Sequence, residues 1–171
     1  MIFSDDLIKL ATETLDLARQ ADMKIATVES CTGGLIGALL TEIAGSSDVF
    51  ERGFTTYSNE AKIELVGVDQ DTLTQHGAVS EQVAHEMALG GLKQSKAQLV
   101  IAVTGVAGPG GGSAEKPVGL VHIALGAAVG LFPKIVAHEA YQFGDIGRSE
   151  VRMATVKASL EMIKSQLEVF G

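Results

Sequence analysis

The sequence predicts a three-layer α/β/α domain with a mixed β-sheet. Segments with helical periodicity alternate with short apolar runs, a pattern typical of a sheet that helices cover on both faces. Two apolar runs follow one another near the end of the chain with no helix between them, which indicates a mixed rather than a purely parallel sheet. A chain of 171 residues can bury a core without disulfides or a structural metal. We therefore expect one domain over residues 1–171.

The first half of the chain predicts two strands, each of which runs into a helix. In order, the elements are a helix at 5–21, a strand at 24–28, a helix at 35–44, a strand at 50–58 and a helix at 60–67. The helices carry apolar residues three and four apart, and the strands are short apolar, aromatic or β-branched runs. Ser4 and Asn59 stand where N-caps are expected, because their side-chain oxygens can accept hydrogen bonds from the first amides of a helix.

The second half predicts three strands and two longer helices. In order, the elements are a short helix or turn within 69–80, a helix at 81–93, strands at 98–105, 118–126 and 133–143, and a last helix from about 149. Ser80 is the expected N-cap of the helix that follows it. The run 98–105 is continuously apolar, as in a strand buried on both faces, and it opens into a glycine-rich loop.

Composition and charge exclude several classes of protein. The net charge is −8 and no basic cluster occurs, which argues against binding a nucleic-acid backbone but leaves a mononucleotide possible as a ligand. No stretch of about 18 uninterrupted apolar residues is present, so we expect no membrane span. The single cysteine, Cys31, cannot form an intrachain disulfide, and the first residues lack the features of a secretion signal. We expect a cytoplasmic protein.

Ser30 is placed like a nucleophile. It lies between a strand and a helix that begins near Gly33, where free backbone amides could stabilise an oxyanion. The alternative is that Ser30 or Thr32 only caps this helix, and that Gly33 and Gly34 permit close packing. Cys31 is a rival nucleophile, but no histidine stands at a spacing that would activate it, and an isolated cysteine is usually a buried small apolar residue.

Lys62 is a candidate general base. We expect it in the first turn of the helix behind Asn59, where the helix dipole disfavours a cation and lowers the lysine pKa. Tyr57, at the end of the preceding strand, could relay or donate a proton. The alternatives are an exposed lysine paired with a nearby glutamate and a half-buried strand tyrosine. Ser47 is either an ordinary turn residue or a second candidate nucleophile.

Two further features suit an anion. The glycine-rich run that begins with Thr104 and Gly105 and includes Gly108 can form a concavity of backbone amides, although a flexible surface loop would have the same composition. Arg148, just before the last helix, could clamp a phosphate or carboxylate, or could simply be solvated. The histidines show no metal-binding spacing, so we expect no metal site; they are His76, His85, His122 and His138.

Four motifs together resemble the CinA C-terminal-domain family over nearly the whole chain. They are Val28-Glu29-Ser30-Cys31-Thr32-Gly33-Gly34, Thr56-Tyr57-Ser58-Asn59-Glu60-Ala61-Lys62, His76-Gly77-Ala78-Val79-Ser80, and Thr104-Gly105-Val106-Ala107-Gly108-Pro109 with Lys116-Pro117-Val118-Gly119. One departure is that Ile146 and Gly147 separate Gly144-Asp145 from Arg148, whereas related sequences usually have the arginine directly after the aspartate.

The resemblance implies a fold and an activity. The fold would be a three-layer α/β/α sandwich with a mixed, mostly parallel five-stranded sheet. The activity would be nicotinamide-nucleotide amidohydrolysis, in which nicotinamide mononucleotide becomes nicotinic acid mononucleotide and ammonia in pyridine-nucleotide recycling. The resemblance also implies a homodimer or other homo-oligomer and no cofactor. The implied catalytic residues are Ser30 or Ser47 with Tyr57 and Lys62, and the implied substrate-binding residues are Thr104 and Arg148.

The expected chemistry begins when Lys62, directly or through Tyr57, removes the serine proton, and the alkoxide then attacks the carboxamide. Amides of the glycine loop and of the helix start would hold the oxyanion. We accordingly expect substrate contacts from Thr32, Gly33, Gly34, Thr104, Gly105, Gly108 and Arg148. Two rival functions stay open: a non-catalytic nucleotide-binding or sensor domain linked to competence or DNA damage, and an interaction module of a DNA-uptake or repair assembly, which the acidic charge opposes.

Overall fold

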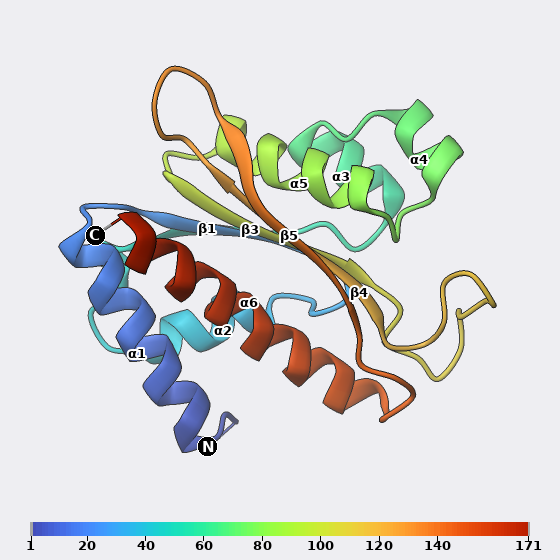
Figure 1. Ribbon diagram of the computed structural model, residues 1–171, viewed down its shortest axis with the longest axis horizontal. Coiled ribbons are helices and arrows are strands. Elements are labelled where there is room, and N and C mark those ends of the chain that lie inside the picture. Colours follow the sequence, from blue (N-terminus) through green and yellow to red (C-terminus); the bar gives the residue numbers. More distant parts are fainter. Residues whose placement is uncertain (1, 171) are drawn as a thin grey trace.

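A five-stranded sheet lies at the centre of the computed structural model, which describes residues 2–170 (Figure 1). The strand order is β2-β1-β3-β4-β5. Strands β2, β1 and β3 pair in parallel, and β4 is antiparallel to both of its neighbours. Only β4 therefore runs against the others, which confirms the mixed, mostly parallel sheet. The bounds are β1 Ile25–Glu29, β2 Phe50–Thr55, β3 Leu99–Gly105, β4 Leu120–Ala127 and β5 Lys134–Gln142.

Helices cover both faces of the sheet, which confirms the three predicted layers (Figure 1). One face carries α1 (Asp5–Gln20), α2 (Leu35–Glu42) and α6 (Arg148–Phe170). The other carries α3 (Asn59–Val66), α4 (Gln70–His76) and α5 (Glu81–Gln94). A short 3-10 helix, η1 (Ser46–Asp48), precedes β2. None of the helices in the described part of the chain combines the length and apolar character that crossing a bilayer requires.

The continuous apolar run of β3 contributes side chains to two hydrophobic cores, one on each face of the sheet. Along β3, Leu99, Ile101 and Val103 belong to the core beneath α1, α2 and α6. The alternate residues, Val100 and Ala102, belong to the core beneath α5. Because successive side chains of a strand point to opposite faces, a strand buried on both sides must be apolar throughout.

Two of the three expected helix caps are confirmed and one is wrong. The hydroxyls of Ser4 and Ser80 accept hydrogen bonds from the amides of α1 and α5, respectively. Asn59, however, is the first residue of α3 rather than its cap. Ser58 is the cap, since its backbone is extended and its hydroxyl accepts from the Ala61 amide at 3.0 Å. Lys62 consequently lies at the fourth position of α3.

Candidate active site

The ends of β1 and β2 meet at the carboxyl edge of the parallel strands. Ser30 directly follows β1, and its amide donates to the Val103 carbonyl of β3 at 3.1 Å. Thr56 directly follows β2, and its amide donates to the Glu29 carbonyl of β1 at 2.8 Å. These backbone bonds fix Ser30 and Thr56 side by side, as expected for polar residues that end neighbouring parallel strands.

Lys62 reaches this edge from α3. Its Nζ lies 3.0 Å from the Ser30 Oγ and donates to the Thr56 carbonyl oxygen at 2.8 Å. Only 1% of the Lys62 residue is exposed. Because lysines are almost never fully buried without a partner of opposite charge, a lysine held by a hydroxyl and a carbonyl is unusual. The structure thus brings together two predicted site residues, Ser30 and Lys62.

The environment of Lys62 favours its neutral form. Burial lowers the pKa of the Lys62 ammonium below its usual value of 10.5, because a low-dielectric surrounding disfavours the charged state. The expected direction is therefore found, and burial is its largest cause. In the charged form Lys62 donates to Ser30; in the neutral form its lone pair can accept the Ser30 proton.

The start of α2 is held by Glu29, a residue that the sequence analysis did not single out. Its buried carboxylate accepts hydrogen bonds from the Thr32 hydroxyl at 2.6 Å and from the amides of Gly34, Ile36 and Gly37 at 2.9–3.0 Å. These helix-terminal amides are therefore already occupied, which corrects the expectation that they are free to hold an oxyanion. Thr32 likewise turns its hydroxyl to Glu29. The only sequence signal was a carboxylate just before a helix start.

The turn between Ser30 and α2 has a fixed shape. Gly33 and Gly34 adopt φ values of +60° and +98°, which L-residues other than glycine rarely take. Arg152 of α6 donates to the carbonyls of Cys31 and Thr32 at 3.1 and 3.0 Å. Burial raises the pKa of the Cys31 thiol to about 12, so little thiolate exists at neutral pH. The turn presents Ser30, not Cys31, as the available nucleophile.

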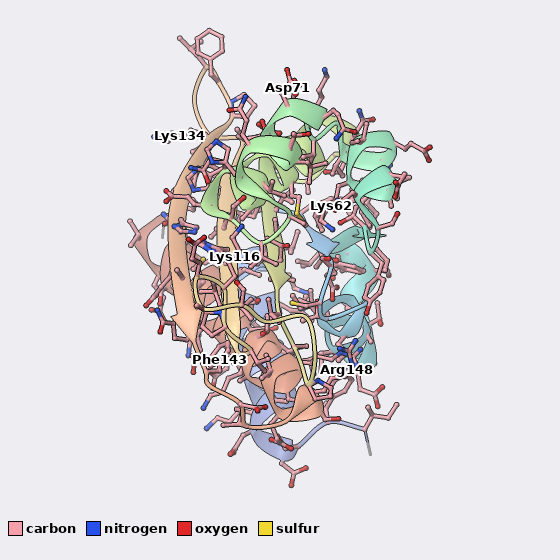
Figure 2. The ribbon with its side chains drawn as sticks, turned by 90° about the vertical axis from the view of Figure 1, so that its right-hand side faces the viewer. Lys62, Asp71, Lys116, Lys134, Phe143 and Arg148 are labelled. Carbon is pink, nitrogen blue, oxygen red and sulfur yellow. The ribbon has the colours of Figure 1, made fainter. Side chains whose placement is uncertain are left out.

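Tyr57 and Arg148 meet beside this turn. Arg148, the first residue of α6, donates to the Tyr57 hydroxyl at 2.9 Å and to the Gly108 carbonyl of the glycine-rich loop at 2.8 Å. In Figure 2, Lys62 of α3 lies in the upper part of the view and Arg148, at the start of α6, in the lower part. The two extra residues before Arg148 thus do not keep it from Tyr57 and the loop.

Two other candidates have different surroundings. Thr104 is buried, and its hydroxyl donates to the Ala78 carbonyl at 2.8 Å, which ties β3 to the segment before α5. Ser47 lies in η1, which leads into the start of β2. Val49, two residues later, accepts from the amide of Ile25, the first residue of β1. Ser47 therefore lies at the amino edge of the parallel strands, at the other end of the sheet from Lys62.

The fold and the Ser30–Lys62 pair define an α/β/α protein with a candidate serine–lysine site at the carboxyl edge of its parallel strands. The sequence profile of the CinA C-terminal domain matches residues 7–167. A solved structure, competence/damage inducible protein CihA from Agrobacterium tumefaciens, superimposes with a TM-score of 0.91 and 51% identity over 97% of this chain and 98% of that one. The chain belongs to the CinA C-terminal domain family.

Relatives of this chain differ in length and in name. It is 50% identical over 125 residues to "Nicotinamide-nucleotide amidohydrolase PncC" of Escherichia coli (strain K12), a match that spans 73% of this chain and 76% of that protein. It is 44% identical over 156 residues to "CinA-like protein" of Chlorobaculum tepidum, spanning 90% of this chain but only 36% of that longer protein. The family domain therefore occurs both in chains of similar size and as part of larger ones.

Proposed function

We propose that this chain is a hydrolase that converts nicotinamide mononucleotide to nicotinic acid mononucleotide and ammonia, with Ser30 as nucleophile and Lys62 as general base. The observation that carries the proposal is the 3.0 Å contact between the Lys62 Nζ and the Ser30 Oγ in a buried setting. The substrate is taken from the relative named a nicotinamide-nucleotide amidohydrolase, which is 50% identical over 125 residues.

The acylation step uses the two side chains directly. Neutral Lys62 takes the Ser30 proton, and the Ser30 oxygen attacks the carboxamide carbon to give a tetrahedral intermediate. Lys62, now an ammonium, gives this proton to the amide nitrogen as the C–N bond breaks, and ammonia leaves. The Tyr57 hydroxyl accepts a hydrogen bond from Arg148 and makes none with Lys62. This favours direct proton transfer from Ser30 to Lys62 over a relay through the Tyr57 phenol.

The deacylation step repeats the same proton transfers with water as nucleophile. Lys62 takes a proton from water, and the hydroxide attacks the acyl-Ser30 carbonyl. The C–O bond to Ser30 then breaks, the Lys62 ammonium returns its proton to the Ser30 oxygen, and the carboxylic acid product releases its proton to solvent and leaves as the carboxylate. Because Glu29 occupies the amides of Gly34, Ile36 and Gly37, the oxyanion donors would be other backbone amides, in the turn after Ser30 or in the glycine-rich loop. Arg148, anchored on Gly108 of that loop, is suited to the 5′-phosphate because a guanidinium binds phosphate by paired charge-assisted hydrogen bonds.

The test is an end-point and rate assay for both products in the presence of a chelator. Ammonia and nicotinic acid mononucleotide should form in equal amounts, and Ser30→Ala and Lys62→Ala should each lower kcat by at least about 100-fold. Ser47→Ala is the matched serine variant, and because Ser47 lies at the other edge of the sheet it should retain most of the activity.

Each other outcome points to a specific alternative. Loss of activity in Ser47→Ala with retention in Ser30→Ala would transfer the nucleophile role to Ser47. Tight binding of the nucleotide without turnover would favour the sensor reading. Activity without acylated protein in acid-quenched samples, measured by mass spectrometry, would favour direct attack of a Lys62-activated water.

A further inference from the structure

Three histidines and a glutamate gather on the α5 side of the sheet, where α5 packs on β4 and β5. Glu81 and His85 lie one turn apart at the start of α5, and His138 lies on β5, which runs along that helix (Figure 1). One side-chain ligand atom from each of these residues lies within 4.8 Å of the other two. His122 of β4 stands behind His138, with their rings stacked at a centroid distance of 5.3 Å.

We propose that Glu81, His85 and His138 form a binding site for one divalent transition-metal ion such as Zn²⁺, with His122 as a positioning residue. The Glu81 Oε1 lies 3.7 Å from the His85 Nε2 and 3.8 Å from the His138 Nδ1. In a tetrahedral zinc site with bonds of about 2.0–2.2 Å, ligand atoms lie roughly 3.3 Å apart. Both distances to Glu81 exceed this value by about half an ångström, and Glu81 is exposed and free to move. The ligand atoms of His85 and His138 lie within 4.8 Å of one another, so the two rings must also approach when the ion binds.

The hydrogen-bond pattern selects ligand atoms that can face a metal. The His138 Nε2 lies 3.1 Å from the His122 Nδ1. If the Nε2 proton is donated to His122, the His138 Nδ1 carries a lone pair directed at Glu81 and His85. This is the arrangement by which a second side chain fixes the tautomer of a metal-bound histidine. Burial lowers the pKa of both His138 and His122, which favours the neutral imidazole that ligation requires.

A second observation that points to a ligand concerns His85. Within residues 2–170, its Nε2 is one of the few buried side-chain polar atoms without a hydrogen-bond partner. A buried nitrogen without a partner is costly, and a metal ion would satisfy it. Two imidazoles and a carboxylate are a common three-ligand set for zinc, in which solvent takes the fourth position. The bound ion would join the start of α5 to the edge strand β5.

The sequence spacing conceals this site. Glu81 and His85 have the i, i+4 spacing of one helix face, but the third ligand comes from a strand more than fifty positions later. The β4–β5 pairing sets His138 opposite Ala124, so His122, two residues along β4, shares its face. The proposed site therefore runs against the expectation, drawn from spacing alone, that the histidines form no metal site.

The test uses the full-length chain after treatment with chelator and dialysis. Calorimetric titration with ZnCl₂ should give one site per chain, and Zn²⁺ at 100-fold above its Kd should raise Tm by about 5–10 °C. Co²⁺ should give the intense d–d absorption of a four-coordinate ion. His85→Gln and His138→Gln should each weaken Zn²⁺ binding at least tenfold and remove the Co²⁺ signal.

Two further variants make the result specific. His76→Gln, at an exposed histidine of α4 outside the cluster, should bind Zn²⁺ like the parent chain. His122→Ala should weaken binding by about 10–100-fold while a four-coordinate Co²⁺ spectrum can still be reached at high Co²⁺. Absence of Zn²⁺ binding by the parent chain, or equal binding by the His85→Gln and His138→Gln variants, would overturn the proposal. Neither result bears on turnover, which is measured with chelator present.

Discussion

At the residue scale, Lys62 is the most informative side chain. It is buried with a hydroxyl and a backbone carbonyl as partners rather than a carboxylate. The same desolvation that lowers its pKa makes it a better base at neutral pH and also costs stability when it is protonated. The two effects can be measured separately, one by turnover and the other by unfolding.

The Lys62 contribution to stability should depend on pH in a defined direction. Because its pKa is lower in the folded chain than the usual 10.5, the unfolded chain binds more protons between the two values, so stability rises with pH across that window. The contribution is complete above about pH 10.5 and is lost as pH falls through the folded pKa. Urea unfolding at several pH values should therefore show that Lys62→Met gains stability relative to the parent chain as pH falls. Lys93→Met, at an exposed lysine of α5, should show no such trend.

Arg148 should contribute by binding the phosphate of the proposed substrate, nicotinamide mononucleotide. Arg148→Lys removes the paired geometry of the guanidinium while keeping its charge, and should lower kcat/KM for nicotinamide mononucleotide by about 10–100-fold. For the corresponding nucleoside, which lacks the phosphate, the same substitution should lower kcat/KM much less. Steady-state kinetics with both compounds check this. Equal losses would indicate that Arg148 acts by positioning Tyr57 and the Gly108 loop instead.

The side chains of the candidate site were easier to select from the sequence than their surroundings. Ser30, Tyr57, Lys62 and Arg148 carry recognisable chemistry at strand ends and helix starts, so they could be selected in advance. The Thr56 carbonyl could not be, because every residue has one and only the pairing of β1 with β2 places this oxygen beside Lys62. The choice between Ser30 and Ser47 also depended on the direction in which β2 pairs.

At the scale of the elements, α2 depends on a carboxylate from the preceding strand. Gly34, its N-cap, has no side chain to bind the free amides, and Glu29 takes over that role. The negative charge also lies at the positive end of the helix dipole. The Ser30 turn is therefore framed by Glu29 on one side and Arg152 on the other. The sequence predicted the helix but not this cap, because the acceptor belongs to β1.

Glu29→Gln should destabilise the fold although it replaces only one carboxylate oxygen by an amide nitrogen. A neutral amide cannot accept all four hydrogen bonds, and its own N–H₂ would face amide donors. We expect a loss of about 3 kcal/mol in the free energy of unfolding, as for a buried charge-assisted network. Glu42→Gln, at the exposed end of the same helix, should change it by less than about 0.5 kcal/mol. Chemical denaturation checks both values, and similar stabilities of the two variants would contradict the capping role.

At the scale of the whole molecule, the position of Lys62 depends on how α3 packs against α5. A Cβ added to Gly90 of α5 would lie 1.8 Å from the Val66 carbonyl oxygen of α3. That contact is with backbone, so the helices must separate to admit a methyl group. Lys62 lies one turn before Val66 on the same helix. Gly90 thus affects the position of Lys62 through the packing of α3 against α5, although it does not contact the site.

Gly90→Ala should lower both stability and turnover. In an exposed helix this substitution stabilises, but here the clash should cost about 2 kcal/mol or more. Turnover should fall because α3 carries Lys62, the proposed base. Lys93→Ala, an exposed change on the same helix, should leave both quantities near the parent values. Thermal unfolding and the product assay check the prediction, and normal activity in a destabilised Gly90→Ala variant would show that α3 tolerates the shift.

The layered fold itself was accessible from the sequence because burial on both faces leaves a continuous apolar run, as in β3, and burial on one face leaves helical periodicity, as in α1. The order of the strands and the meeting of His85 with His138 were not accessible from spacing. Both arise from pairings between distant segments, which local patterns do not encode.

Because Lys62 is held by the backbone carbonyl of Thr56, mutating the Thr56 side chain does not test that contact. The Thr56 hydroxyl is buried and, among residues 2–170, has no hydrogen-bond partner, so replacement by valine removes nothing that the fold uses. The backbone oxygen that holds the lysine is the same in both cases. A saturation mutagenesis map of this chain would therefore mark position 62 as intolerant and position 56 as tolerant of valine, and would not reveal that the backbone at position 56 holds the lysine.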